Sequence, residues 1–559
     1  MKMVLTKVAE ELEKALDKKI DQSFFSIPPK PEMGNICYPF FELAQKAGTN
    51  PAELAEKTAQ RIKAGKVIEK VKPVGPYLNF FINPEFLAEN YLMNKQNIRN
   101  NTEKKKIMIE FAHPNTHKAF HIGHLRNIIT GESLCRILDY LGHEVIRVNY
   151  QGDIGMHIAK CLWGVQRKKA EYESIKKENL DKKIEFLSGC YAFGAQSFEK
   201  EEKTKKEIKN INQQVYEQSE EIKEIYQETK KWSLDYFDRV YKRLGTHFDR
   251  FYFESEVFEK GRKMVFDFLD KGVFKESEGA VIFEGEKYGL HNRVFVNSAG
   301  QPTYEGKEVA LADLQMNEYN PDKIIHVVGK EQTEYFKVIF QALEEIVPGI
   351  RQKEEHLAYG WVGLKSGKMS SRTGKVVLAE WLLSEVKKQI AQIMEESEQK
   401  NSEEIKEKVT LGAVKYAMLR LGVDIDMSFD IKESISLSGN SGPYLMYILA
   451  RVNSILKKHG KVEKLQEVPE EITDEEKQLL LKIADFDSAC LRAGDNLDPS
   501  ELAKYLFGLA KVFNEFYDRC PILRAKGEIK VFRLNLIKEV REIMKKGLLL
   551  LGIDIVEKM

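Results

Sequence analysis

The pattern of apolar and polar positions predicts a strand–helix–strand unit in the first third of the chain. Residues 104–112 (KKKIMIEFA) form a short apolar run that is typical of a buried strand. A helix is expected to begin near His121, because apolar residues then recur at the helical spacing i, i+3, i+4 and i+7. These residues are Leu134, Ile137, Leu138 and Leu141. Gly142 can end this helix, and residues 144–149 (EVIRVN) predict a second strand. A unit of this kind opens the parallel sheet of many nucleotide-binding domains.

The same pattern divides the rest of the chain. Residues 165–245 are rich in Lys, Glu and Gln with few Pro or Gly. We interpret them as long solvated helices inserted into the sheet domain, without chemistry of their own. The sheet pattern returns at 324–329, and it is followed by a helix and by a strand at 356–364. From about residue 430 the pattern is helical to the end.

The first hundred residues predict a small module that mixes helices and strands. A helix opens the chain, and GPYLNFFIN (75–83) is an aromatic, strand-like run. We therefore expect three domains: an α+β module at 1–103, an α/β domain with a Rossmann-type parallel sheet at 104–430, and an all-α bundle at 431–559. The helical insertion would occupy about 165–250 of the middle domain.

Length and composition agree with a soluble multidomain protein. The chain has 559 residues, which leaves room for three or four domains of roughly 100–200 residues each. Lys and Arg (87) nearly balance Asp and Glu (86), so nucleic-acid binding would need local basic patches. The six cysteines are scattered without a CxxC pair, which argues against a disulfide framework and a cysteine zinc site. There is no run of ~18 apolar residues, and the start is a charged amphipathic helix and not a signal peptide. We expect a cytoplasmic protein that binds no membrane.

The stretch HPNTHKAFHIGHLRN (113–127) is the first candidate for chemistry. It lies where a sheet strand leads into a helix, a place where backbone N–H groups and the positive end of the helix can bind phosphate. His121 and His124 lie three apart on one face of the first turn, so both could stabilise charge on one α-phosphate. Gly123 would let a ligand such as adenine approach the backbone. Two histidines at this spacing can also be simple capping or core residues. Four histidines, an asparagine and a lysine within twelve residues favour a site.

The stretch GKMSSRTGK (367–375) is the second candidate. Two glycines bracket a loop that carries three basic side chains and two serines, and such a loop can fold over a triphosphate. The side chains are Lys368, Arg372, Lys375, Ser370 and Ser371. Alone, the stretch would be an ordinary basic surface loop. Because the first stretch occurs in the same chain, the triphosphate-binding interpretation of this loop becomes the favoured one.

These two stretches resemble the signatures of class I aminoacyl-tRNA synthetases. His121-Ile-Gly-His124 is similar to the HIGH signature, and Lys368-Met-Ser-Ser-Arg372 resembles KMSKS, with Ser371 in place of the second lysine. In arginyl-tRNA synthetases that lysine can be missing, and a lysine before HIGH takes its place. Lys118 occupies this position. The resemblance implies catalytic roles for Lys118, His121, His124 and Lys368, and ATP binding by His121, Gly123, His124, Lys368, Ser370 and Arg372.

The resemblance to arginyl-tRNA synthetases covers nearly the whole chain. Residues 28–55 and 75–83 resemble the N-terminal module that grips the elbow of the tRNA, where Asn79 and Phe80 are candidates for D-loop contacts. Residues 110–127 resemble the family pattern around HIGH, with Ala112-His113 in place of a serine pair. QGDIGMH (151–157) is similar to the GDxGxQ segment, with His157 in place of glutamine.

The resemblance also implies which residues select arginine. A guanidinium is best bound by a planar acceptor such as a carboxylate. Tyr304 and Glu308 lie at i, i+4, on one face of an expected helix. In the family a tyrosine and an aspartate of this segment read the side chain, so Glu308 replaces the aspartate. Gln332 corresponds to a glutamine beside the arginine, while Glu110 and Asn115 would hold its amino and carboxylate ends. Two alternatives remain: Tyr304 and Glu308 could lie on a solvated helix face, and Glu110 could serve only to order the loop.

The C-terminal helices resemble an anticodon-binding domain. Residues 447–464 and 518–547 are basic although the whole chain is neutral. They include Arg451 and Tyr447, and further rings lie nearby for unstacked bases. These rings are Tyr444, Phe513, Phe516 and Tyr517. The alternative is a core of aromatic residues under a solvated face.

The expected reaction follows from the resemblance. Arginine attacks the α-phosphate of Mg²⁺-ATP, and the arginyl group of the adenylate passes to the 3′-terminal adenosine of tRNA(Arg). The tRNA would be needed before arginine is activated. We expect the protein to use ATP with Mg²⁺, to bind no zinc, and to be a monomer. Two alternatives remain open: another class I synthetase, such as a cysteinyl enzyme, and a catalytically silent paralogue that only binds tRNA.

Overall fold

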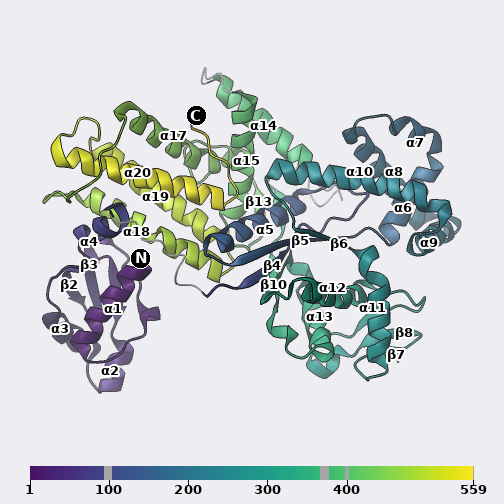
Figure 1. Cartoon of the computed structure of the whole chain (residues 1–559), viewed down its shortest axis with the longest axis horizontal. Helices are drawn as coiled ribbons and strands as arrows, with labels where there is room; N and C mark the ends of the chain where they lie inside the picture. The colour runs from purple at the N-terminus through teal and green to yellow at the C-terminus, as the bar shows by residue number, and fades with distance from the viewer. Residues whose placement is uncertain (94–102, 366–376, 397–401, 558–559) are drawn as a thin grey trace. The chain divides into compact units, whose positions relative to one another are not determined.

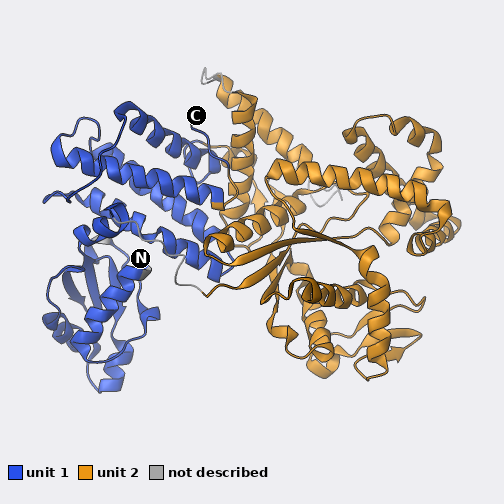
Figure 2. Ribbon diagram, viewed as in Figure 1, with its two compact units in different colours: residues 1–101, 437–549, 554–559 blue, residues 102–436, 550–553 orange. Residues whose placement is uncertain are grey.

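The chain divides into two compact units in a computed structural model that describes residues 1–93, 103–365, 377–396 and 402–557 (Figures 1 and 2). The first unit contains residues 1–101, 437–549 and 554–559, and the second contains residues 102–436 and 550–553. Over the described residues, no helix combines the length and the apolar character needed to cross a membrane.

The second unit is built on a five-stranded parallel sheet with the order β11-β10-β4-β5-β6. Its strands are β4 (Lys106–Glu110), β5 (Glu144–Gln151), β6 (Arg250–Phe253), β10 (Lys323–Gly329) and β11 (Glu354–Tyr359). The predicted strand–helix–strand unit is confirmed, because α5 (Ile122–Tyr140) connects β4 to β5. The strand order reverses between β4 and β10. In open sheets of this kind, ligands bind at such a switch point, outside the carboxyl ends of the strands.

Helices cover both faces of this sheet (Figure 1). α5 lies on one face with α14 (Ala379–Glu396) and α15 (Glu403–Leu419) beside it. On the other face, α12 (Tyr304–Tyr319) buries Ala310 and Leu311 against strand residues such as Met108 and Val148. The strands are apolar on both sides because neither face meets solvent.

The expected helical insertion is present between β5 and β6. It consists of α6 (Met156–Arg167), α7 (Lys169–Ile175), α8 (Leu180–Lys200), α9 (Glu202–Tyr216) and α10 (Glu220–Leu244). These helices are polar outside and bury a core of their own, which includes Leu162, Ile208 and Ile222. Each helix is therefore amphipathic, and the insertion is a packed bundle.

A second inserted segment between β6 and β10 escaped the sequence pattern. It contains α11 (Glu254–Leu269), followed by a three-stranded antiparallel sheet. The strands are β7 (Lys275–Ser277), β8 (Ala280–Phe283) and β9 (Arg293–Val296). Phe283, Phe295 and Val309 pack in one core with α13 (Thr333–Ile346).

The single strand predicted at 356–364 is wrong, because the structure breaks it in two. β11 ends at Tyr359, and β12 (Val362–Leu364) pairs instead with β13 (Met427–Phe429). At the break, a Cβ on Gly360 would lie 2.5 Å from the backbone of Ile425. The buried Arg126 also donates to the carbonyl oxygens of Gly360 (2.6 Å) and Ile425 (2.8 Å), which holds the chain at this corner.

Residues 550–553 belong to the same unit as the parallel sheet. Leu551 and Ile553 are 1% and 0% exposed. Ser133 Oγ of α5 donates to the Leu550 carbonyl (3.1 Å), and Lys415 Nζ of α15 donates to the Gly552 carbonyl. This short segment is therefore an integral part of the core beneath α5.

The first unit joins an α+β module to a helical bundle (Figure 2). The module has an antiparallel sheet with the order β1-β3-β2 and four α-helices: β1 (Ile36–Pro39), β2 (Ile68–Val74), β3 (Tyr77–Ile82), α1 (Lys2–Leu16), α2 (Phe41–Ala47), α3 (Pro51–Arg61) and α4 (Pro84–Ala88). The bundle contains α17 (Gly442–His459), α18 (Asp474–Asp495), α19 (Ser500–Arg519) and α20 (Gly527–Leu550). The predicted α+β and all-α characters are both confirmed.

Candidate active site

His121 and His124 meet at the N-terminus of α5. The two residues cap the helix reciprocally: His121 N–H donates to His124 Nδ1 (3.1 Å), and His124 N–H donates to His121 Nδ1 (3.4 Å). Their ring centroids are 3.8 Å apart. Because both Nδ1 atoms accept hydrogen bonds, the neutral rings carry their protons on Nε2. The capping interpretation is thus correct, and it leaves two N–H donors at the end of a helix.

Both histidines are held neutral by their surroundings. Burial lowers the pKa of His121, and the nearby charge of Lys118 lowers it further. Burial also lowers the pKa of His124 well below its ordinary value, with smaller effects from His121, His113 and Lys118. A neutral imidazole with its proton on Nε2 can donate a hydrogen bond from Nε2 to a phosphate oxygen. Gly123 lies against this pair, because a Cβ there would lie 2.9 Å from His121 Cε1.

The loop before these histidines has an unusual backbone. Ala112, His113 and His117 have φ values of 80°, 46° and 65°, a region that non-glycine residues adopt rarely. Asn127 of α5 helps to hold the loop, since its Oδ1 accepts from Ala112 N–H (2.6 Å) and its Nδ2 donates to Val327 O (2.7 Å). Such strain persists only where surrounding contacts fix the chain, and it is common at active sites.

The inserted helix α10 supplies more of these fixing contacts. His117 N–H donates to Ser233 Oγ (2.9 Å), and His117 Nε2 lies 2.8 Å from Thr229 Oγ1, which itself donates to Ile225 O. Tyr236 OH accepts from Phe120 N–H (3.3 Å). Burial, with a contribution from Lys230, lowers the pKa of His117 to about 3, so this ring is a neutral connector. The insertion therefore helps to hold the histidine loop in place, which is a structural role and agrees with the expectation that it has no chemistry of its own.

Lys118 lies in the same loop. Its Nζ is 4.7 Å from the ring centroid of Tyr191 in α8. Asn115 lies earlier in the loop and forms an isolated β-bridge with Gly152, just after β5. A Cβ on Gly152 would lie 2.1 Å from Asn115 Oδ1, so a larger residue there would displace the Asn115 side chain. Asn115 is thus fixed beside the carboxyl ends of β4 and β5.

Glu110, at the end of β4, is part of a buried hydrogen-bonded cluster. Its Oε1 lies 3.1 Å from His326 Nδ1 on β10, and its Oε2 accepts from Gln315 Nε2 (2.5 Å). His326 Nε2 lies 2.7 Å from Glu354 Oε2 on β11. Burial would lower the pKa of His326, but the two carboxylates raise it well above its usual value. Glu110 is 1% exposed and occupied by these partners, which agrees with an ordering role.

Glu308, on α12, has a different environment. Among the described residues, its carboxylate makes no hydrogen bond or ion pair. Burial, followed by the charge of Glu110, raises the pKa of Glu308 to about 8, although His326 opposes the shift. The neighbouring acid Glu254 is already paired with Lys307 (2.7 Å). A carboxyl group that is hard to ionise and surrounded by acids is a site that a cationic ligand would stabilise.

The remaining site candidates lie around this acid or beyond the described residues. Tyr304 begins α12, one turn before Glu308, and is 56% exposed. Gln332 is exposed and ends the 3-10 turn Lys330–Gln332 that follows β10. Lys368, Ser370 and Arg372 lie outside the described residues. The chain that follows them pairs with the histidine segment: Ile122 N–H donates to Val377 O (2.9 Å), and His121 forms a bridge with Leu378.

The two halves of the site lie in one neighbourhood. Glu308 interacts electrostatically with Glu110, which lies 3.8 Å from His113 Nδ1, and His113 in turn acts on His124. The acid and the paired imidazoles are therefore connected through neighbouring groups at the switch point of the sheet. Sequence reasoning missed His326 and Thr229, whose partners are distant in sequence.

Asn79 and Phe80 do not present their side chains to solvent. They are 1% and 0% exposed, and Asn79 Nδ2 donates to Lys72 O (3.2 Å). Direct contact of these side chains with RNA disagrees with this burial, because β3 is the central strand of its sheet. Exposed rings of this module include Phe24 and the pair Phe41 and Tyr77, which are 53% and 39% exposed with centroids 5.8 Å apart.

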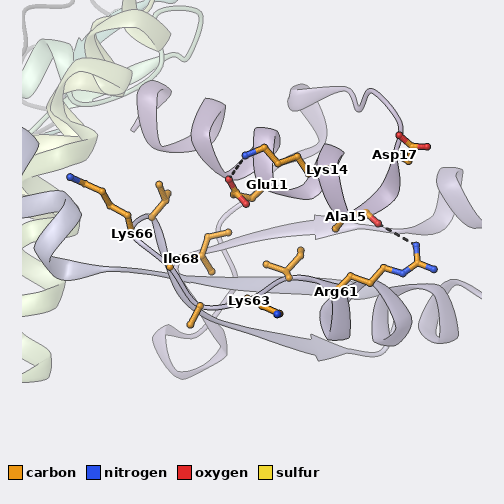
Figure 3. Close-up of a pocket in the computed structure, with 12 residues that line it drawn as sticks. Glu11, Lys14, Ala15, Asp17, Arg61, Lys63, Lys66 and Ile68 are labelled. Atoms are coloured by element: carbon orange, nitrogen blue, oxygen red, sulfur yellow. Dashed lines mark hydrogen bonds and ion pairs between the residues drawn. The ribbon is translucent and has the colours of Figure 1, made fainter.

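The module also contains a basic groove of about 700 Å³ (Figure 3). Its charged lining residues are Glu11, Lys14, Asp17, Arg61, Lys63 and Lys66. Lys14 is paired with Glu11 (2.7 Å), and Arg61 donates to the Ala15 carbonyl (3.3 Å). The groove is part of the first unit and contains none of the residues around His124 or Glu308.

Arg451 and Tyr447 form a polar cluster on the helical bundle. Arg451 Nη2 donates to Tyr447 OH (2.7 Å), and Arg451 Nη1 donates to Asn514 Oδ1 (3.2 Å). The guanidinium also lies 5.2 Å from the ring centroid of Tyr517, which is 39% exposed. In contrast, Phe513 and Phe516 are fully buried. The aromatic residues of this region therefore divide into core rings and a partly exposed cluster.

Protein-family models match three parts of the chain. The class I (R) tRNA synthetase catalytic domain matches residues 88–430. The arginyl tRNA synthetase N-terminal domain matches residues 2–82, and the DALR anticodon binding domain matches residues 445–559. In the described residues, no group of three or more His, Cys, Asp or Glu side chains could hold a metal ion.

Curated relatives and solved structures agree with these matches. The chain is 34% identical to an arginine–tRNA ligase of Treponema denticola over 98% of this chain and 96% of that protein. It is 32% identical to that of Clostridium acetobutylicum over 99% of each. An arginyl-tRNA synthetase of Thermus thermophilus matches with a TM-score of 0.83 at 25% identity, covering 99% of this chain and all of that one. The chain therefore belongs to the arginyl-tRNA synthetases, the ATP-dependent arginine–tRNA ligases of class I.

Proposed function

We propose that this chain activates arginine with Mg²⁺-ATP and transfers the arginyl group to the 3′-terminal adenosine of tRNA(Arg). One observation carries the proposal. An acid without a partner among the described residues, Glu308, shares a neighbourhood with two neutral imidazoles that cap a helix N-terminus. The acid suits a cationic side chain, and the imidazoles suit a phosphate.

In the first step, the arginine carboxylate attacks the α-phosphorus of ATP, and pyrophosphate leaves. The Nε2–H groups of His121 and His124 would donate to the oxygens that gain charge in the transition state. Lys118 would add a positive charge beside them, and Gly123 would allow the nucleotide to approach. Lys368, Ser370 and Arg372 would contact the triphosphate. Mg²⁺ would arrive with ATP and offset the phosphate charge.

The arginine side chain would be read by Glu308, with Tyr304 and Gln332 beside it. A guanidinium brings the positive charge that makes ionisation of Glu308 favourable, and it can donate two parallel N–H bonds to the carboxylate. Asn115 would hold the carboxylate end of the substrate. Glu110 would fix the loop, because protein donors already orient both of its oxygens. It would also face the amino group of the substrate.

In the second step, a terminal hydroxyl of the tRNA attacks the carbonyl of the adenylate, and AMP leaves. No protein nucleophile takes part, so rate enhancement would come from positioning and charge stabilisation. Arg451 and Tyr447 would contact the anticodon region. In the N-terminal module we assign RNA contact to the exposed rings of Phe41 and Tyr77, with Asn79 and Phe80 as the core beneath them.

ATP–pyrophosphate exchange tests this proposal directly. The full chain is assayed with arginine, lysine and cysteine, with and without tRNA(Arg). Exchange with arginine that depends on tRNA is the expected result. Exchange with cysteine would instead identify another class I synthetase. No exchange with any amino acid, together with retained tRNA binding, would identify a silent paralogue.

We also propose that the enzyme works as a monomer in the cytoplasm. Six free, buried cysteines suit a reducing compartment. Sedimentation at several protein concentrations tests the monomer, since a dimer would show a mass that rises with concentration. Fractionation of the source cells tests the location.

A further inference from the structure

Tyr150 lies near the end of β5, directly opposite Tyr252 of β6. Both tyrosines belong to the apolar core that α12 covers, together with Ala310 and Leu311. Tyr252 OH donates to Glu318 Oε2 (2.8 Å). The paired tyrosines thus have the same sheet face and the same covering helix, and they differ in what their hydroxyl groups contact.

The Tyr150 hydroxyl is buried without a partner. Tyr150 is 9% exposed, and its Oη makes no hydrogen bond to any residue in the described part of the chain. Most buried side-chain hydroxyl groups in native proteins are paired, because an unpaired one loses its hydration without compensation. A buried hydroxyl without a protein partner is a candidate for contact with a ligand.

The surroundings of this hydroxyl point to the kind of ligand. Burial raises the pKa of Tyr150 well above its usual value, and the carboxyls of Glu254, Glu308 and Glu110 and the phenol of Tyr335 raise it further, so these groups lie near its hydroxyl. Glu254 is bound to Lys307, and Glu110 is bound to His326 and Gln315. Glu308, Tyr335 and Tyr150 are the three members of this group without a hydrogen bond to the described residues, and Tyr150 is the one whose hydroxyl is buried without a partner. Glu308 and Tyr150 therefore offer a carboxylate and a hydroxyl group to the same ligand.

We propose that Tyr150 is a specificity-determining residue of the amino-acid pocket, whose hydroxyl accepts an N–H bond from the guanidinium that Glu308 binds. This inference rests on the arginine site proposed above. A guanidinium has five N–H donors in a plane, and one carboxylate takes only two of them. A phenol oxygen beside the carboxylate provides an acceptor for a third. A lysine ammonium has a different shape and would use this pair less well.

The test compares Tyr150→Phe with the matched variant Tyr252→Phe in the full chain. Arginine binding is measured by calorimetric titration with tRNA(Arg) present, and KM and kcat are measured by aminoacylation. Tyr150→Phe should weaken arginine binding and raise its KM by about ten-fold, with the KM for ATP unchanged. Tyr252→Phe should leave arginine binding unchanged.

Thermal unfolding separates a binding role from a structural one. Tyr150→Phe should leave Tm unchanged or raise it, since no protein hydrogen bond is lost, whereas Tyr252→Phe should lower Tm. Arginine affinity equal to wild type in Tyr150→Phe would overturn the inference. If Glu308→Gln then still weakens arginine binding, the pocket stands without Tyr150. If neither variant changes arginine binding, the pocket itself is misplaced.

Discussion

His124 and His326 are buried histidines of the same unit, yet their charge states are opposite. Burial lowers the pKa of His124 well below the ordinary value, and its neighbours His121, His113 and Lys118 lower it further. His326 lies between Glu110 and Glu354, and its pKa rises well above that value. The comparison teaches that neighbours, more than depth, decide the charge of a buried imidazole. One ring is suited to donate to phosphate, and the other binds two buried acids, Glu110 and Glu354.

Removing His326 should have the largest effect. His326→Gln leaves Glu110 and Glu354 as two buried acids without their shared cation. Loss of one partner of a buried pair lowers the free energy of unfolding by about 3–5 kcal/mol. Urea denaturation measures the change, and His247→Gln, at an exposed histidine, is the control. A His326→Gln variant as stable as wild type would mean that the cluster is not charged.

The pH dependence of this contribution has a defined sign. The folded state holds the His326 proton more tightly than the unfolded chain does. Its stabilisation is therefore complete below about pH 6.5, the ordinary histidine pKa, and is lost as the pH rises through the raised folded value. The difference in stability between wild type and His326→Gln should accordingly be greatest at low pH.

Replacing His124 tests the other side of the comparison. His124→Asn keeps an acceptor that can cap His121 N–H, but it lacks the Nε2–H that would reach the α-phosphate. The kcat of pyrophosphate exchange should fall by about 10²–10³-fold, as for other donors to developing charge. Tm should change little. A fall in Tm comparable to that of His124→Ala, with exchange retained, would leave His124 with a capping role alone.

Glu308→Gln should have an intermediate effect. Loss of the charge-assisted bonds to a guanidinium should raise the KM for arginine by roughly 10–100-fold and leave the KM for ATP unchanged. Asp313→Asn, on the same helix and paired with Lys260, is the control. Because burial and the charge of Glu110 raise the pKa of Glu308 to about 8, the wild-type KM for arginine should fall as the pH rises through 8 and should level about one unit above it. Glu308→Gln should abolish this dependence, and a parallel profile would remove Glu308 from the pocket.

Thr229→Val should have the smallest effect. The variant keeps the shape of the side chain and removes the acceptor of His117 Nε2. Loss of one buried hydrogen bond is worth about 1–3 kcal/mol. We expect a fall in kcat of several-fold with an unchanged KM for arginine, because the strained loop then holds His121 and His124 less firmly. Thr204→Val, a buried threonine of α9, should leave kcat unchanged.

The local features of the fold could be predicted from the sequence. The unit from β4 to β5 follows from apolar spacing, and the place of the histidine pair at a helix N-terminus follows from its position where a strand leads into a helix. These signals involve neighbours in sequence. The break after Tyr359 was not visible, because Gly360 is required by the distant backbone of Ile425.

The supporting contacts of the site could not be predicted for the same reason. His326 meets Glu110 across 216 positions of sequence, and Thr229 meets His117 across 112. Nothing local to either histidine indicates its partner. Asn79 and Phe80 are consecutive residues of β3 and are both buried, because that strand is the central one of its sheet, which only the packing reveals. Burial of an exposed-looking motif is a tertiary property.

The segment at 550–553 determines when the core of the second unit can be completed during translation. The sheet and α5 leave the ribosome hundreds of residues before the four residues that pack beneath α5 and receive the bonds from Ser133 and Lys415. Until then, the surface that later covers Leu551 and Ile553 remains apolar and uncovered. A nascent chain would thus complete the core of its second unit only after translation has passed the last long helix. Truncated products would therefore be inactive and prone to aggregation.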